Sequence, residues 1–86
     1  MTSNSNLNLN LHVRSRSASI FQGKVASVSS VNQTGEFDIL PMHANFITLI
    51  KDYVTLDKGL KSEKKIPVKN AVMSVIDGNV EVYVEI

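Results

Sequence analysis

The sequence of 86 residues contains no cysteine and no tryptophan. The absence of cysteine excludes disulfides and thiolate metal sites, so packing and sheet hydrogen bonds must hold the fold. Nine Lys and Arg against eight Asp and Glu leave a net charge of +1. Binding to a nucleic-acid backbone usually requires a much greater concentration of positive charge. We therefore expect no nucleic-acid partner.

The sequence also lacks long apolar runs. No segment approaches the roughly 18–20 apolar residues of a membrane span, so we expect no direct membrane insertion. Residues 1–6 carry neither the basic nor the apolar part of a secretory signal, and we expect them to form a disordered tail. Residues 7–86 should form a single domain, because so short a chain cannot divide its buried surface between two cores.

Both ends of this domain alternate apolar and polar residues with a period of two, which is typical of a strand with one buried face. The apolar positions are Leu7, Leu9, Leu11 and Val13 at one end, and Val80, Val82, Val84 and Ile86 at the other. Turn residues recur at short intervals between these ends, and Asp77-Gly78 fits a tight hairpin best. This arrangement predicts an all-β fold, either an antiparallel sandwich or a barrel.

The expected strands are 7–13, 19–22, 24–31, 36–40, 46–51, 53–57, 63–68, 71–76 and 79–86. The broken alternation of 24–31 predicts a bulge or a bend. Pro67 cannot donate a ladder hydrogen bond, which predicts an edge strand or a bulge. Residues 42–51 also fit a helical spacing, but Phe46–Ile50 is short and rich in β-branched and aromatic residues, so we predict a strand.

Motifs for chemistry are scarce. His12 and His43 are far apart, and neither has a second ligand at a metal-binding spacing. The four glycines are isolated, so there is no phosphate-binding loop, and no nucleophile elbow is present. We expect no metal, no cofactor and no catalytic residue. An enzyme would have to pair His43 with Glu36 or Asp38 in a pocket.

Charge is unevenly distributed near the carboxyl end. Residues 57–69 carry five lysines against Asp57 and Glu63, whereas residues 70–86 carry three acids and no basic residue. This asymmetry suits either a docking surface for an acidic partner or a solvated hairpin whose lysines prevent edge-to-edge pairing.

Residues 35–45 read GEFDILPMHAN. This segment resembles the hallmark of the amino-terminal domain of the epsilon subunit of the bacterial F-type ATP synthase, called delta in mitochondria. The likeness extends backward through Ser15 and residues 20–23, and forward through residues 46–51 and 79–82. It implies a β-sandwich of about ten antiparallel strands in two packed sheets, in agreement with the strand pattern above.

The resemblance also implies a function. In this family the domain is a non-catalytic part of the central stalk, and it couples the gamma subunit to the membrane rotor ring during ATP synthesis driven by ion flow. Glu36 aligns with a residue near the rotor ring, whereas Ser15, His43 and Thr48 align with positions at or near the gamma interface. The implied location is the cytoplasmic face of the bacterial inner membrane, as a peripheral part of the complex.

The sequence departs from the family at several positions. Met42 replaces a usual Gly, Asp52-Tyr53 replaces Pro-Gly, and Lys69-Asn70-Ala71 replaces Ser-Gly-Gly, so local turns that need a positive φ are affected. The family's carboxyl-terminal helical hairpin is absent, which fits a short subunit or an excised domain. The alternative function is a free-standing module that binds a glycan or peptide, but the sequence has few aromatic residues to form a platform.

Overall fold

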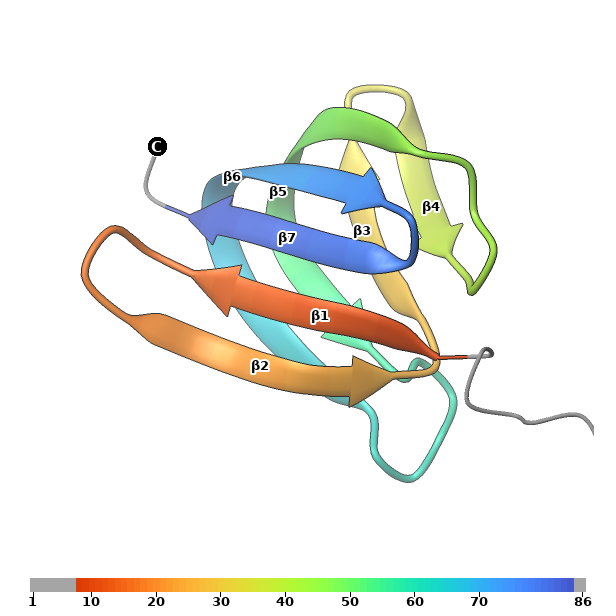
Figure 1. Ribbon diagram of the computed structural model, residues 1–86. Coiled ribbons are helices and arrows are strands. Elements are labelled where there is room, and N and C mark those ends of the chain that lie inside the picture. Colours follow the sequence, from red (N-terminus) through yellow and green to blue (C-terminus); the bar gives the residue numbers. More distant parts are fainter. Residues whose placement is uncertain (1–7, 85–86) are drawn as a thin grey trace, which may run out of the picture.

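The computed structural model describes residues 8–84, which form seven β-strands (Figure 1). The strands are β1 (Leu9–Arg14), β2 (Ser19–Val25), β3 (Val28–Asn32), β4 (Gly35–Ile39), β5 (Phe46–Leu56), β6 (Lys64–Ile76) and β7 (Asn79–Val84). The prediction of a disordered tail at residues 1–6 lies outside the described residues, as do the outermost positions of the two predicted end strands. Within residues 8–84 no helix is long and apolar enough to cross a membrane.

The strands form one hydrogen-bonded sheet in the order β2-β1-β7-β6-β5-β3-β4. All neighbours are antiparallel except β1 and β7, which run parallel. The sheet is therefore mixed, and the prediction of a purely antiparallel fold is wrong for this pair. Hairpins fix the direction of consecutive strands, but β1 and β7 come from opposite ends of the chain and no short connection constrains them.

The sheet bends at bulges in its two longest strands, β5 and β6. The pairing of β5 with β6 shifts between Lys51 and Asp52, where Lys69 is the extra residue, and the pairing of β3 with β5 shifts at the same place. Such bulges bend a strand and increase its twist. Figure 1 shows β2, β1 and β7 in front of β3 and β4, with β5 and β6 passing between these groups. We call β2, β1 and β7, together with the first half of β5 and the second half of β6, the front layer, and β3 and β4, together with the remaining halves of β5 and β6, the back layer.

Residues 8–84 form seven strands, whereas about ten were expected. The predicted strands 46–51 and 53–57 are the two halves of β5, and 63–68 and 71–76 are the two halves of β6. Each pair remains one strand because the chain continues through a bulge rather than a turn. The bend expected within 24–31 is confirmed between β2 and β3, and a helix over 42–51 is excluded.

The core lies between the two layers and consists of inward-pointing aliphatic side chains. Its fully buried members include Leu9, Leu11, Val13, Val28, Ile39, Val54, Met73, Val75, Val80 and Val82. These residues occupy alternate positions of their strands, as the period of two predicts. Pro67 pairs with β5 in the half of β6 that β7 does not reach, so its expected place at an edge is confirmed.

Candidate functional site

The outer surface of the front layer exposes apolar side chains along β5 and β6. Ile47 and Leu49 on β5 are 68% and 67% exposed, and Ile76 on β6 is also exposed. They share one surface because Phe46 and Ile50, at the alternate positions of β5, point inward. We call Ile47, Leu49 and Ile76 the apolar face. Contiguous exposed apolar residues on a soluble domain commonly mark a contact with another protein.

The turn before β5 carries His43, whose ring lies on the inward-pointing side of β5 and not on the apolar face. The Nδ1 atom of His43 lies 2.7 Å from the carbonyl oxygen of Ala44, to which it donates a hydrogen bond when protonated. The His43 ring packs 5.1 Å from the ring of Phe46. Thr48 lies further along β5, and its hydroxyl oxygen accepts a hydrogen bond of 3.1 Å from the Asn32 side chain. Two of the predicted interface residues, His43 and Thr48, are therefore brought to the same part of the molecule.

Met42 precedes His43 in a strained turn. Its φ of 73° lies in the left-handed region, which a residue with a Cβ seldom adopts. The turn is closed by a hydrogen bond of 3.1 Å from the His43 amide to the Leu40 carbonyl. Met42 is 85% exposed. The substitution of the family's usual glycine thus leaves the turn conformation in place and adds an apolar side chain at its tip.

Glu36 lies on β4, on the outer surface of the back layer. Its carboxylate accepts a hydrogen bond of 3.0 Å from the Tyr53 hydroxyl. The ammonium group of Lys65 lies 4.7 Å from the centre of the Tyr53 ring. Desolvation raises the pKa of the Tyr53 phenol above its usual value, and the Glu36 carboxylate raises it further. Glu36 is exposed, and a tyrosine of β5, two strands away in the sheet, holds it in place.

The acids and the histidine proposed for an enzyme do not converge. Asp38 accepts a hydrogen bond of 2.5 Å from Ser29 and lies 4.0 Å from Lys58, while Glu36 contacts Tyr53. Among residues 8–84, no hydrogen bond or ion pair joins His43 to either carboxylate. The observed contacts give no support to the acid–base pair that this hypothesis requires.

Ser15 lies in the turn between β1 and β2, at the opposite end of the molecule from the turn that contains His43 (Figure 1). Its hydroxyl oxygen accepts hydrogen bonds from the amides of Ser17 and Ala18, at 3.3 and 3.2 Å. Ser15 therefore shapes this turn. The structure does not bring it together with His43 and Thr48.

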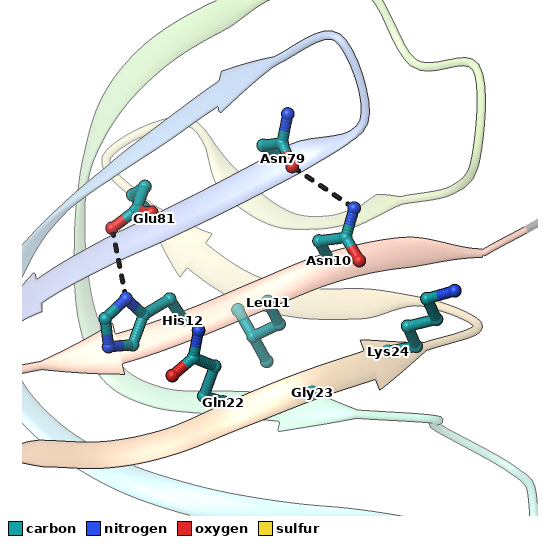
Figure 2. A pocket seen from close by; sticks show the side chains of 8 residues that line it. All are labelled: Asn10, Leu11, His12, Gln22, Gly23, Lys24, Asn79 and Glu81. Carbon is teal, nitrogen blue, oxygen red and sulfur yellow. Dashed lines mark hydrogen bonds and ion pairs between the residues drawn. The ribbon is translucent and has the colours of Figure 1, made fainter.

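A polar hollow of about 380 Å³ crosses β2, β1 and β7 on the outer surface of the front layer (Figure 2). Its side chains pair with one another: Asn10 donates to Asn79 at 3.2 Å, and His12 lies 3.7 Å from Glu81. Arg14 lies beside the hollow, also 3.7 Å from Glu81. Within residues 8–84, no group of three or more side chains is arranged to hold a metal ion.

Neither tyrosine offers an open ring for stacking a sugar. Arg14 lies over the Tyr83 ring at 4.7 Å and donates a hydrogen bond of 2.6 Å to its hydroxyl. That hydrogen bond raises the pKa of the Arg14 guanidinium. Lys65 covers the Tyr53 ring in the same way. The glycan-binding alternative therefore has no aromatic platform among the described residues.

Sequence reasoning missed Tyr53, which orients Glu36, and the apolar face. Phe46–Ile50 is apolar on both faces of a strand, and this pattern was the available signal for the apolar face. Because only one face of a strand can point into the core of a two-layer fold, the other apolar face must be exposed or covered by a partner. The contact of Tyr53 with Glu36 had no such signal, because the two residues are 17 positions apart in the chain.

The chain is similar to known proteins both in sequence and in structure. A sequence model of the family described as ATP synthase, Delta/Epsilon chain, beta-sandwich domain matches residues 8–86. No curated protein matches the sequence. Among solved structures, a chain of the Euglena gracilis mitochondrial ATP synthase, from a structure of the OSCP, F1 and c-ring, is similar with a TM-score of 0.80 and 16% identity. The alignment covers 98% of this chain and 56% of that one.

A chain of the central stalk and c-ring of the Tetrahymena thermophila mitochondrial ATP synthase is also similar, with a TM-score of 0.71 and 8% identity. The alignment covers 88% of this chain and 62% of that one. At these identities the two likenesses establish a shared fold. This chain spans less than two thirds of the length of either relative.

Proposed function

The chain belongs to the delta/epsilon chain family of the ATP synthase, through its β-sandwich domain, and on this premise we propose that it is a central-stalk subunit that couples the gamma subunit to the membrane rotor ring. The delta/epsilon chain is a non-catalytic subunit of the enzyme. In this proposal the chain transmits torque from ion flow to the catalytic head and turns over no substrate. We place it at the cytoplasmic face of a bacterial inner membrane, as a peripheral part of the complex.

The apolar face is the observation that carries this proposal. Ile47, Leu49 and Ile76 expose aliphatic groups on the outside of a well-packed layer, and such groups contribute most of the affinity of a protein interface when a partner buries them. His43 and Thr48 lie near the start of the same strand, on the side of β5 opposite Ile47 and Leu49, and both align with the gamma-facing positions of the family. We therefore propose that the gamma subunit packs on the apolar face.

Glu36 supplies the second contact in this proposal. It lies on the back layer, away from the apolar face, so the chain can bind two partners at once. Tyr53 restricts the Glu36 side chain through the hydrogen bond of 3.0 Å, which lowers the entropy lost on binding. A carboxylate at this position would pair with a basic or hydrogen-bonding group of the rotor ring. One continuous sheet joins the two surfaces, as a mechanical coupler requires.

The test is binding of the chain to its cognate gamma subunit, measured by calorimetry. The double substitution Ile47→Asp with Leu49→Asp should raise the Kd at least about 30-fold, because it places two charges in a buried apolar contact. The matched control is Ile20→Asp, which changes an exposed isoleucine on β2, away from the apolar face. Circular dichroism would establish that each variant is folded.

A second measurement separates the two contacts. Glu36→Gln should leave gamma binding unchanged and weaken binding to the isolated rotor ring by less than about fivefold, since an exposed ion pair contributes only about 0–1 kcal/mol. If the folded wild-type chain forms no complex with gamma at micromolar concentration, the proposed function is wrong.

A further inference from the structure

The connection between β5 and β6 combines positive charge with an exposed leucine. We call residues 57–65, which are this connection and the first two residues of β6, the lysine loop. Its basic residues are Lys58, Lys61, Lys64 and Lys65. Leu60 lies in the middle of the loop, between Gly59 and Lys61, and its side chain is 52% exposed.

Hydrogen bonds hold the lysine loop in a defined conformation. The Asp57 carboxylate accepts hydrogen bonds of 2.6 Å from the amide of Ala26 and 2.6 Å from the hydroxyl of Ser62. The Leu60 amide donates to the Asp57 carbonyl at 2.9 Å, and the Glu63 amide donates to the Leu60 carbonyl at 3.0 Å. Leu60 is therefore presented outward from an ordered loop.

The lysines of the loop are poorly neutralised by their surroundings. Asp57 is buried and bonded as described, and the Glu63 carboxylate accepts a hydrogen bond of 2.7 Å from the Gly59 amide. Among residues 8–84, Lys61, Lys64 and Lys65 have no carboxylate within 4.0 Å. The loop therefore presents a net positive charge to solvent.

We propose that the lysine loop binds the surface of an anionic phospholipid bilayer. The lysine ammonium groups would pair with lipid phosphates, and Leu60 would enter the interfacial region, while no segment crosses the membrane. Clustered lysines beside an exposed apolar residue are the combination that binds anionic bilayers. Charge alone would serve an acidic protein equally well, but the exposed leucine at the tip of the charged loop favours a bilayer.

The position of the loop is compatible with the proposed function without depending on it. Lys58 lies 4.0 Å from Asp38, and Lys65 lies over Tyr53, the partner of Glu36. These contacts place the lysine loop beside the surface that would meet the rotor ring. Lipid headgroups around the ring would then be accessible to the loop. The inference goes beyond the proposed function, because the loop carries its charge whether or not the chain joins a rotor.

Leu60→Trp tests this inference directly. The chain contains no tryptophan, so the introduced indole is the sole source of tryptophan fluorescence. With vesicles of phosphatidylcholine and phosphatidylglycerol, the emission of Leu60→Trp should shift to shorter wavelength. With pure phosphatidylcholine it should not shift. Ile20→Trp is the matched control, at an exposed isoleucine outside the lysine loop, and it should shift with neither vesicle.

Co-sedimentation of the full chain with the same vesicles tests the charges. The double substitution Lys58→Gln with Lys61→Gln should lower partitioning about 25-fold, since each lysine near an anionic surface contributes about fivefold. Lys69→Gln, which removes one exposed lysine outside the loop, should lower it less than about twofold. Partitioning of the wild-type chain should fall as salt is added.

Three results would overturn the inference: no binding of the wild-type chain to anionic vesicles at low salt, an equal loss on Lys69→Gln, or binding to a polyglutamate peptide but not to vesicles. The vesicles contain no protein, so these outcomes are separate from the outcome of the gamma-binding experiment.

Discussion

Tyr53 of β5 donates a hydrogen bond of 3.0 Å to Glu36 of β4, although β3 lies between their two strands. The pairing of β3 with β5 passes from Ser30–Val54 to Val31–Lys51 and leaves Asp52 and Tyr53 outside the register. The bulge turns the Tyr53 ring across the surface of the back layer. A backbone irregularity thus positions the side chain that orients Glu36.

Glu36→Gln should lower the pKa of Tyr53, because removal of the negative charge makes the tyrosinate easier to form. The chain has two tyrosines, so the measurement is an ultraviolet titration of tyrosinate with Tyr83→Phe in both proteins. An unchanged titration would mean that the Tyr53 contact with Glu36 does not persist in solution.

The raised pKa of Tyr53 also predicts how stability depends on pH. A phenol whose pKa is higher in the folded state contributes its full stabilisation below pH about 10, the usual pKa of tyrosine. That contribution should be lost as the pH rises through the higher pKa of the folded state. Urea denaturation between pH 9 and about 11 should show a steeper loss for the wild-type chain than for Tyr53→Phe.

Asp57→Ala should lower the free energy of unfolding by about 2–4 kcal/mol. The substitution removes the acceptor of two short hydrogen bonds, from Ala26 and Ser62, and leaves the amide of Ala26 without a partner. It also places alanine at a φ of 53°. Asp57→Asn keeps an acceptor oxygen and tolerates this φ, so its loss in urea denaturation should be roughly half as large. Equal losses would contradict this account.

Met42→Gly should raise the free energy of unfolding by about 0.5–1 kcal/mol. Glycine adopts a φ of 73° without steric cost. The relief of this backbone strain outweighs the entropy that glycine adds to the unfolded chain. Thermal denaturation would detect the change, and Met42→Ala, which retains the strain, is the control. Stabilisation by alanine as large as that by glycine would show that the side chain, and not the backbone, causes the effect.

Gly78→Ala should destabilise the domain by about 1–2 kcal/mol through the backbone alone. Gly78 has a φ of 81° in the turn between β6 and β7, and an added Cβ would meet no atom within 4 Å. Gly23→Ala is the matched comparison, because Gly23 lies in β2 without a positive φ and an added Cβ would lie 3.4 Å from the Phe21 ring. Urea denaturation should show the larger loss for Gly78→Ala.

Much of the fold could be predicted because its signals are local. The alternation of Leu9, Leu11 and Val13 with polar residues correctly identified buried positions of β1, and Asp77-Gly78 correctly identified the last hairpin. The strand count was wrong because the pattern predicted strands that end at Lys51 and Val68 and begin again at Tyr53 and Ala71. In the structure Asp52 takes a φ of 71° inside β5, and both segments continue through a bulge.

The candidate site was only partly predictable. Glu36, His43 and Thr48 were named from the resemblance, and their roles at the two interfaces remain predictions. The structure brings His43 and Thr48 together at the start of β5, leaves Glu36 on the back layer and places Ser15 in a distant turn. The apolar face became visible only when the inward-facing residues of β5 had been identified.

The sequence by itself determined that the chain is all-β, which side chains enter its core, and to which family it belongs, because periodicity, turn chemistry and motif are properties of neighbouring residues. The tertiary structure alone decided that β1 and β7 lie side by side in parallel and that Tyr53 reaches Glu36. These relationships join residues far apart in the chain, and they depend on where the bulges bend β5 and β6, which no local pattern specifies.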